Sequence, residues 1–313
     1  MIRHRILKKN LSGDIKIKKT LAFSIAELLV YMVVLSLLML PLLNILKESV
    51  NSSIIKTDLS IIQNRFEKAY SVIELPIFYA GMGVPLDHNE YKMSFNNVMK
   101  SPFFWNGPIS VVQDGRYTKL RLVYAVNLGV TVTKTKYLHK NDDKTISLSS
   151  NLDRILSRQT PLNIRNIILI PSSYPSRTPF IVEGIHPSER KLNISSYINN
   201  SYTRIPEGSS IYQLSAYEIS ARNGILYATN YRVTGDQPLA RGVDDINFEL
   251  DIDRKILKIY FLMRGRITYP KIQPISNLSL WPDTLQSDQI KKNSYYKRRV
   301  YKCVFPLVNC RDE

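Results

Sequence analysis

The most prominent feature of the sequence is an apolar run over residues 21–46, in which Glu27 is the only formally charged side chain. A helix over these 26 residues is about 39 Å long, because each residue adds about 1.5 Å. The hydrocarbon core of a bilayer is about 30 Å thick, so such a helix can cross it with tilt. The run therefore predicts a membrane-spanning helix.

Beyond this run the apolar residues narrow to a stripe at the spacing of one helix face, with polar residues between them. Pro41 lies inside the apolar run, where its missing N–H can be tolerated. Pro76 is expected to end the helix. The pattern predicts one helix over residues 24–75, about 78 Å long. The stripe consists of Leu46, Val50, Ile54, Ile61, Ile62, Phe66, Tyr70 and Ile73.

From residue 76 onward the composition shifts to Pro, Gly, Tyr and β-branched residues, and apolar residues alternate with polar ones. Residues 245–252 and 256–263 predict a hairpin with one solvent-exposed face, joined by a turn at residues 253–255. Further strands are expected at residues 120–128, 164–170, 180–185, 211–219 and 225–233. Loops are expected at residues 138–163 and 186–208, which are rich in Asn, Ser, Lys and Pro.

These patterns predict an α+β fold, in which a long N-terminal hydrophobic helix packs on an antiparallel β-sheet domain, without internal repeats. A chain of 313 residues with 44% apolar content can bury a sizeable core. The expected parts are a basic leader (1–22), a membrane-spanning helix (23–46), an amphipathic continuation of that helix (47–75) and a β-rich globular domain (76–313).

The charge distribution predicts the orientation in the membrane. The formal net charge is +17, and residues 1–22 hold seven Lys or Arg residues against one acid, Asp14. Residues 47–65, after the apolar run, hold only three Lys or Arg residues. The positive-inside rule therefore places the N-terminus in the cytoplasm and the globular domain on the far side. A conventional secretory signal is disfavoured, because no A-x-A-like site follows the run.

A carboxylate within a membrane span needs an explanation, since an acidic residue at the helix centre costs about 2.5–3.5 kcal/mol. One interpretation is that Glu27 lies near the cytoplasmic interface and reaches the lipid headgroups. Its neighbours add a second: the sequence KKTLA (18–22) is followed directly by FSIAE (23–27). This order of basic leader, small residue, Phe, fifth-place Glu and apolar run resembles the prepilin motif of type IV pilins and type II secretion pseudopilins.

The resemblance implies three roles for these residues. A prepilin peptidase would cut between Ala22 and Phe23, with Ala22 standing where the family normally has Gly. The new amino group of Phe23 would then be methylated. Glu27, the fifth residue of the mature chain, would pair with the amine of an adjacent subunit as the helices bundle into the core of a filament.

Three further stretches resemble PilW-type minor pilins of the type IV pilus, in the same order along the chain: residues 65–83, 237–248 and 296–309. The resemblance implies a minor pilin that helps to initiate or cap a pilus, with other minor pilins, the major pilin and the inner membrane as partners. Its domain would be periplasmic and later part of the pilus. The alternatives are a J-type pseudopilin of type II secretion and a lone membrane-anchored binding protein.

The sequence offers no catalytic constellation. His4, His88, His139 and His186 are scattered, and no zinc-protease, serine-hydrolase or P-loop motif is present. The acidic residues Asp244, Asp245, Glu249, Asp251 and Asp253 lack the spacing and the Gly of an EF-hand, and their alternation is typical of a solvated strand face. We therefore expect neither an enzyme nor a cofactor or metal site.

Basic and aromatic residues are interleaved near the C-terminus. Such a pattern suits a nucleic-acid backbone, but two other interpretations are favoured here: charged residues on a terminal strand, or a face that docks onto acidic partner subunits. The basic residues are Lys291, Lys292, Lys297, Arg298, Arg299 and Lys302, and the aromatic ones are Tyr295, Tyr296 and Tyr301.

The two cysteines, Cys303 and Cys310, lie close together in the sequence. Six residues separate them, Pro306 included, which is enough for the chain to turn back and close a disulfide in an oxidising periplasm. A disulfide is therefore expected in preference to free thiols or a metal site. A straight strand over residues 301–307 would instead hold the two sulfurs about 20 Å apart.

Overall fold

The computed structural model describes most of the chain from residue 25 onward. The described residues are 25–85, 89, 91–92, 105, 107–115, 117–139, 144–149, 162, 166–173, 179–196, 202–230, 235–285 and 287–310. The chain divides into two compact units, residues 1–56 and residues 57–313. Helix α1 (Ile25–Tyr79), 55 residues long, runs through the boundary between them. In the first unit, residues 25–56 are all helical and all exposed.

Helix α1 does not end before Pro76, so the expected stop is wrong. Proline in a helix removes one hydrogen bond, but the next turn is held by Ile77, which is only 1% exposed in the core. The helix ends at Tyr79, and Gly81 follows with a φ of +82°, a conformation that glycine adopts without a Cβ penalty. The Gly81 N–H donates to the carbonyl oxygen of Val123 at 2.9 Å.

The second unit is built on antiparallel strands, which confirms the expected α+β class in its coarse form. Among the described residues, one sheet has nine strands, in the order β1-β2-β9-β5-β6-β7-β4 with β10 and β11 extending beside β9. Its strands are β1 (Ile109–Asp114), β2 (Tyr117–Thr131), β4 (Thr145–Ser147), β5 (Ile167–Leu169), β6 (Pro179–His186), β7 (Lys191–Ser196), β9 (Ser210–Arg222), β10 (Ile225–Asn230) and β11 (Asp236–Arg241).

A second sheet of four strands has the order β12 (Val243–Asp251), β13 (Ile256–Thr268), β15 (Tyr296–Pro306) and β14 (Ile275–Ser276). Its pairs are antiparallel except β14 with β15, which is parallel. β3 (Lys136–His139) and β8 (Tyr202–Ile205) form a separate antiparallel ribbon. Three short helices complete the described part: η1 (Leu278–Leu280), α4 (Asp288–Lys291) and η2 (Val308–Cys310).

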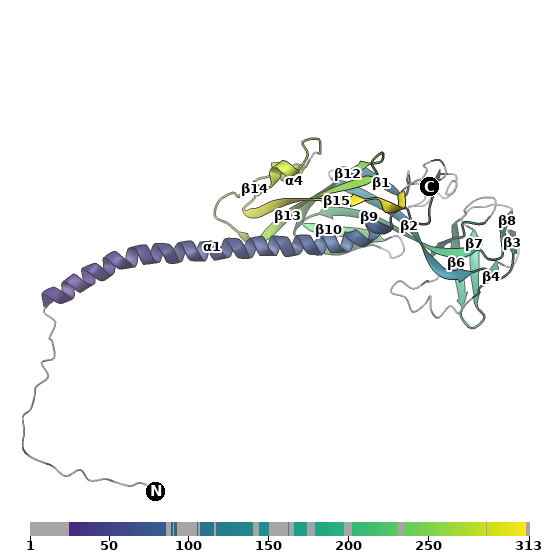
Figure 1. Ribbon diagram of the computed structural model, residues 1–313, viewed down its shortest axis with the longest axis horizontal. Helices are drawn as coiled ribbons and strands as arrows, with labels where there is room; N and C mark the ends of the chain where they lie inside the picture. The colour runs from purple at the N-terminus through teal and green to yellow at the C-terminus, as the bar shows by residue number, and fades with distance from the viewer. Residues whose placement is uncertain are drawn as a thin grey trace, which may run out of the picture. The chain divides into compact units, whose positions relative to one another are not determined.

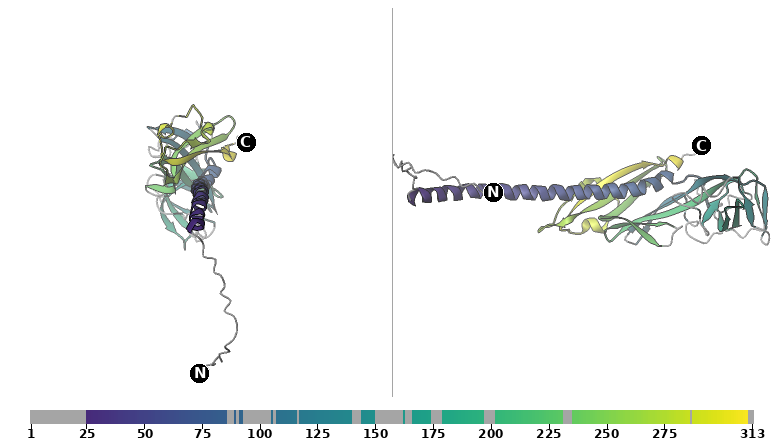
Figure 2. Two further views of the ribbon diagram at one scale, coloured as in Figure 1. Left: turned by 90° about the vertical axis from the view of Figure 1, so that its left-hand side faces the viewer. Right: turned by 90° about the horizontal axis from the view of Figure 1, so that it is seen from below.

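The main core of the second unit lies where α1 meets both sheets. The helix contributes Ile62, Ala69, Ile73 and Ile77, each at most 1% exposed. Figures 1 and 2 show this part of α1 running alongside β13 and β15. From the four-stranded sheet the core takes Ile246, Phe248, Leu257, Ile259, Phe261 and Met263, and from the nine-stranded sheet Leu120, Leu122, Ile219, Ala221 and Leu226.

The helix face that packs on the domain begins later than the sequence pattern predicts. Leu46, Val50 and Ile54 belong to the predicted stripe but are 53%, 55% and 39% exposed. The first buried residue of the helix is Asp58. Aromatic contacts follow: Phe66 stacks on Tyr301 with ring centroids 4.1 Å apart, and Tyr70 stacks on Phe305 at 5.4 Å.

The predicted hairpin is confirmed, but its second face is only partly open to solvent. β12 and β13 pair antiparallel, with Asp251 opposite Ile256 across the turn. On the face predicted to be solvated, Asn247 is 4% exposed, and Tyr260 pairs with it across the strands. Tyr260 and Leu262 pack with Val300 beneath Trp281. Ile252, predicted on the buried face, lies in the turn and is 75% exposed.

The expected loops are partly wrong, because they contain short strands around a second core. Residues 138–163 include β4 and the end of β3, and residues 186–208 include β7 and β8. These strands are only three to six residues long, so their two-residue period is easily missed in a polar stretch. Their apolar side chains, including Ile146, Leu192, Ile194 and Ile205, are buried together with Leu128, Phe180 and Val182.

A buried carboxylate joins the helix to the four-stranded sheet. Asp58 is 0% exposed, and its Oδ1 accepts hydrogen bonds from the backbone N–H groups of Arg266 at 2.9 Å and Ile267 at 3.3 Å. Its Oδ2 accepts from the Tyr269 hydroxyl at 3.2 Å. These N–H groups are available because the register of β13 against β15 shifts between Arg264 and Thr268.

Arg65, two turns further along the helix, secures the same irregular segment of β13. Its Nη1 donates to the carbonyl oxygens of Arg264 at 2.7 Å and Gly265 at 3.0 Å. Two glycines make room for this contact. A Cβ on Gly265 would lie 2.5 Å from both Asp58 carboxylate oxygens, and a Cβ on Gly242 would lie 2.6 Å from the Arg65 Cδ. We call Asp58, Arg65 and residues 264–267 the helix clamp.

The helix clamp predicts a strong effect of Asp58 on stability. Asp58→Ala leaves two buried N–H groups without their acceptor and should lower the free energy of unfolding by about 2–4 kcal/mol. Asp58→Asn keeps one oxygen acceptor and should cost less, about 1–2 kcal/mol. Urea denaturation of the full chain in detergent, followed by tryptophan fluorescence, measures both, because Trp105 and Trp281 lie in the second unit.

Glu67→Ala serves as the control, since Glu67 is an exposed acid on the same helix. It should change the free energy of unfolding by no more than about 0.5 kcal/mol. Gly265→Ala should destabilise as Asp58→Ala does, because the added methyl group collides with the carboxylate. Equal effects of Asp58→Ala and Glu67→Ala would contradict the clamp.

Candidate functional site

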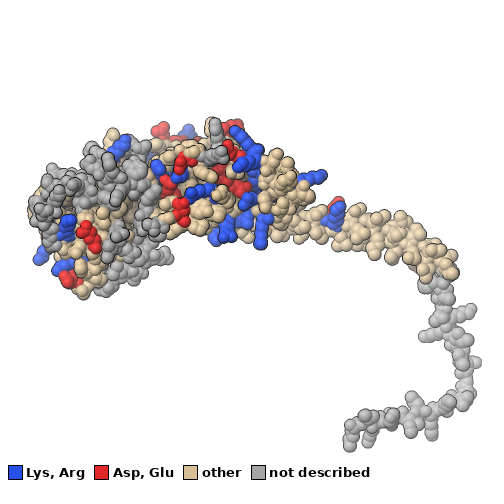
Figure 3. All heavy atoms as spheres, turned by 180° about the vertical axis from the view of Figure 1, so that it is seen from behind, with Lys and Arg blue, Asp and Glu red and all other residues tan. Residues whose placement is uncertain are grey.

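The first unit presents an exposed apolar helix surface, which is the strongest functional feature of the described chain. All large apolar side chains between residues 25 and 46 are 48–83% exposed. The best 18-residue window has a mean hydropathy of 2.5, and none of it is buried. Figure 3 shows this segment as an almost unbroken tan surface. By its length and composition, α1 can cross a membrane.

The polar groups of this segment suit an apolar environment. The backbone is helical throughout, so its N–H and C=O groups pair within the helix. The Ser36 hydroxyl donates to the carbonyl oxygen of Val33 at 2.8 Å, which satisfies the hydroxyl without an outside partner. Pro41 lies within the continuous helix. Little polar surface would therefore lose water on transfer into lipid or into a bundle of similar helices.

Glu27 lies in the first turn of α1, and its side chain is exposed. The N-terminal end of a helix carries a partial positive charge, which stabilises a nearby carboxylate by about 0.3–1 kcal/mol. This position lowers the cost of an acidic residue at the edge of an apolar segment. Ala22 and Phe23, the predicted processing site, lie outside the described residues.

The six predicted basic residues are not brought together on one face. Along β15, Lys297 and Arg299 lie on the face that packs against α1, with Lys297 over the Tyr269 ring at 5.3 Å. Lys302 lies on the opposite face over Tyr260 at 5.7 Å, and Lys291 and Lys292 belong to the end of α4. Figure 3 shows both blue and red side chains on the visible face of the second unit.

Arg298 is buried rather than part of a charged surface. It is 4% exposed, and its Nη1 and Nη2 donate to the carbonyl oxygens of Gln289 at 2.6 Å and Lys292 at 2.7 Å. Arg298 therefore fixes the end of α4 against the sheet. A nucleic-acid backbone could not reach it without displacing that helix.

A largely buried carboxylate, that of Asp245, holds the other end of the same segment. The Ser287 hydroxyl, which caps α4, donates to Asp245, and the Ile246 N–H donates to Asp245 at 2.9 Å. Burial raises the pKa of Asp245 to about 6, with the nearby charges of Asp244 and Asp288 acting in the same direction. Burial also raises the pKa of Asp244, although Arg264 at 3.3 Å opposes that shift.

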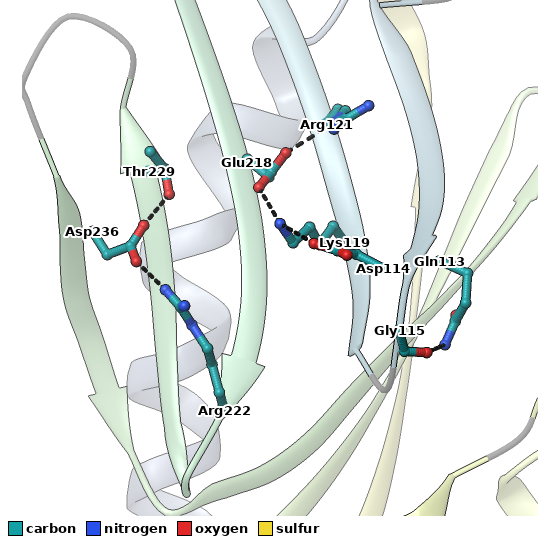
Figure 4. A network of polar contacts seen from close by, with 9 residues as sticks. All are labelled: Gln113, Asp114, Gly115, Lys119, Arg121, Glu218, Arg222, Thr229 and Asp236. Carbon is teal, nitrogen blue, oxygen red and sulfur yellow. Dashed lines mark hydrogen bonds and ion pairs between the residues drawn. The ribbon is translucent and has the colours of Figure 1, made fainter. Parts of the chain in front are cut away.

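A ladder of ion pairs crosses β1, β2 and β9, as Figure 4 shows. Glu218, at 9% exposure, pairs with Lys119 at 2.8 Å and with Arg121 at 2.9 Å. Lys119 also pairs with Asp114 at 2.7 Å. Arg121 lies over the Trp105 ring at 5.1 Å. Because the buried carboxylate has two cations beside it, this ladder fixes strand register and offers no activated nucleophile.

The predicted disulfide is not formed, because Cys303 is a free thiol. Cys303 lies in the middle of β15, which continues straight to Pro306, and its side chain packs against the main core. Burial raises the pKa of this thiol to about 11. The thiolate is the reactive form, so Cys303 is chemically inert at neutral pH. The side chain of Cys310 lies outside the described residues.

Among the described residues, the histidines and acids considered in the sequence are not brought together as a metal-binding group. The acidic residues of β12 have basic or hydroxyl partners: Glu249 pairs with Lys258 at 2.7 Å and accepts from the Tyr260 hydroxyl at 2.9 Å. Within the part of the chain that the structure describes, no three His, Cys, Asp or Glu side chains are placed to hold a metal. His186 is exposed on β6, while His4, His88 and the side chain of His139 lie outside the description.

Sequence reasoning missed the helix clamp, although two signals for it are present. Asp58 lies four residues after Ile54 and four before Ile62, on the predicted apolar stripe, where a charged residue is out of place. Gly265 is a lone glycine within a strand, which indicates a bulge or a close backbone approach. Together they indicate a buried carboxylate against an irregular strand.

The raised pKa of Asp245 predicts how this residue contributes to the pH dependence of stability. Its pKa is about 6 in the folded chain and near 3.8 unfolded, so the folded state binds the proton more tightly. The contribution of Asp245 to the free energy of unfolding should therefore fall by up to about 3 kcal/mol as the pH rises from 4 to 7. Urea denaturation at several pH values should show this slope reduced in Asp245→Asn and retained in Asp253→Asn, a change in the exposed turn. An unchanged slope in Asp245→Asn would contradict the assignment.

No protein-family model, no curated protein and no solved structure matches the chain. A functional assignment therefore rests on its own residues and on the geometry of the two units.

Proposed function

We propose that this chain is a minor pilin of a type IV pilus, similar to the PilW type, which helps to initiate or cap pilus assembly. The observation that carries the proposal is one uninterrupted helix with two different surfaces. Its first part is apolar and fully exposed with Glu27 in the first turn, and its second part is buried against an antiparallel β domain. A filament subunit needs both surfaces: the apolar one packs with the helices of other subunits in the filament core, and the buried one anchors the domain that remains outside.

The residues before the helix support the proposal because they resemble a prepilin processing site. In this proposal a prepilin peptidase cuts between Ala22 and Phe23, and the basic leader stays in the cytoplasm. The subunit then crosses the inner membrane once, with the second unit in the periplasm. Other minor pilins and the major pilin are its partners, and neither a metal nor a cofactor is required.

Processing at Ala22 and Phe23 is the first test. Expression of the full chain with a prepilin peptidase should remove the first 22 residues, and intact-mass spectrometry should find a chain that begins at methylated Phe23. Ala22→Gly should be cut at least as well, whereas Ala22→Leu should block the cut. Ala26→Leu, a matched change within the helix, should leave processing intact. A chain that keeps Met1 with an active peptidase would refute the proposed maturation.

Glu27 provides the second test. If its carboxylate pairs with the N-terminal amine of a neighbour, Glu27→Gln should lower incorporation into pili about tenfold, while membrane insertion is unchanged or improved. Quantitative immunoblotting of sheared pili and of membranes measures the two quantities separately. Glu48→Gln, an exposed acid beyond the apolar segment, is the control and should assemble normally. Normal assembly of Glu27→Gln would contradict the pairing and would support the interpretation that Glu27 only lies near the membrane interface.

A further inference from the structure

Basic and apolar side chains are exposed together at one end of the four-stranded sheet, where β13 ends and β15 begins. The chain passes this end twice, in residues 269–273 and again in residues 291–297. The Tyr269 N–H joins the two segments by donating to the Tyr295 carbonyl oxygen at 2.8 Å. We call these two segments the entry patch. Its exposed basic and large apolar side chains are Lys271, Ile272, Lys291, Lys292 and Tyr295.

The entry patch lies at the end of the second unit where α1 enters it. The contacts of the helix with β13 and β15 show this direction. Tyr70 stacks on Phe305, near the end of β15. Asp58, twelve residues earlier in the helix and its first buried residue, accepts a hydrogen bond from the Tyr269 hydroxyl at 3.2 Å. Figure 1 shows β14 and α4, which lie between the two segments in the sequence, at this end of the sheet.

The charge of the entry patch is positive. Its two segments hold four lysines and no acid. The stretch between them adds two acids, Asp283 and Asp288, and no base, so residues 269–297 keep a net positive charge. The lysines are Lys271, Lys291, Lys292 and Lys297. A partner surface that meets this end of the sheet is therefore expected to be anionic.

Two large apolar side chains lie among these lysines. Ile272 is 51% exposed and Tyr295 is 52% exposed. An aliphatic side chain and a phenol ring beside lysines are typical of surfaces that bind a lipid interface. Tyrosine is enriched at the level of the headgroups, and lysine is attracted to anionic lipids. The composition of the patch thus fits a lipid surface in both its apolar and its charged part.

The chain that leads into this end of the second unit comes from the apolar segment that can cross a membrane. Only residues 47–56 separate that segment from the second unit, and all of them are helical. A helix of this length is about 15 Å long, and the headgroup region adds about 5–8 Å on each side of the hydrocarbon core. Such a short tether gives the patch a high effective concentration at the membrane surface.

We propose that the entry patch docks on the surface of the membrane that α1 crosses. Ile272 and Tyr295 enter the boundary between headgroups and acyl chains, and Lys271 and Lys292 contact the phosphate groups of anionic lipids. The contact needs little affinity of its own, because the helix already holds the chain at the membrane. The proposal goes beyond the pilin function and shares with it only the membrane-crossing helix.

Hydrogen–deuterium exchange of the full chain tests the proposal in three environments: nanodiscs of phosphatidylcholine, nanodiscs with added phosphatidylglycerol, and detergent micelles. Peptides that cover residues 270–273 and 292–295 should exchange roughly threefold more slowly, or slower still, in the anionic nanodiscs than in the other two. Raised salt should remove the difference, because it screens the lysines.

Each other outcome of this experiment contradicts the proposal. Equal exchange in all three environments would overturn the membrane contact and would leave the patch to an acidic protein partner. Equal protection in both kinds of nanodisc would overturn the role of the lysines. Co-purification of the chain with the nanodiscs reports insertion of α1 separately, and a chain that fails to co-purify would contradict the membrane anchor itself.

Matched variants locate the contact. Lys271→Gln and Ile272→Ser should each roughly halve the extra protection in anionic nanodiscs, because the patch holds several such groups. Arg254→Gln and Ile252→Ser remove an exposed cation and an exposed apolar side chain from the turn at the opposite end of the sheet, and should leave the protection unchanged. Equal losses in both pairs would overturn the assignment to the entry patch. Exchange of residues 259–262 in β13 identifies any variant that has lost its fold.

Discussion

The hydrogen bonds that the carboxylate of Asp58 accepts from β13 are the contact on which the arrangement of the second unit depends. They lie at the first buried position of α1, so every later contact of the helix follows from where they fix it. A charged group is costly to bury, and it is retained here because two backbone N–H groups and a hydroxyl surround it. Unlike apolar contacts, such bonds have direction. They define one rotation and one height of the helix against the sheet.

The two sheets depend on the helix as much as the helix depends on them. Leu120 and Ile219 from one sheet and Phe261 from the other are buried in the same core as Ile62 and Ile73 of α1. Without the helix, the inner faces of both sheets would lose a common partner. The stacking of Phe66 on Tyr301 and of Tyr70 on Phe305 extends this contact along β15. Helix α1 thus forms the exposed apolar surface of the first unit and contributes to the main core of the second unit.

Elements with strong periodicity were predictable from the sequence, and elements defined by tertiary contacts were not. The helix and the hairpin of β12 and β13 follow from apolar spacing alone. The prediction that the helix ends at Pro76 was wrong because the burial of Ile77 outweighs one lost hydrogen bond. The prediction that one hairpin face is solvated was wrong because Trp281, which lies further along the chain, covers part of that face. A disulfide was favoured by spacing, yet the straight course of β15 and the packing of Cys303 decide otherwise. In the candidate site, Glu27 falls in the first helical turn, while the six basic residues are divided between the two faces of β15 and the end of α4.

The long antiparallel pair of β2 and β9 has a consequence for the modularity of the fold. Thr131 lies opposite Ser210, so the chain leaves β2 and returns to β9 at neighbouring points. The residues between them carry most of the second core. Topologically, this stretch is an insertion into a hairpin, and its two ends are close enough for a short turn to connect them. The stretch between Thr131 and Ser210 can therefore be gained, lost or exchanged in evolution, or grafted by design, while the helix and its clamp keep their scaffold.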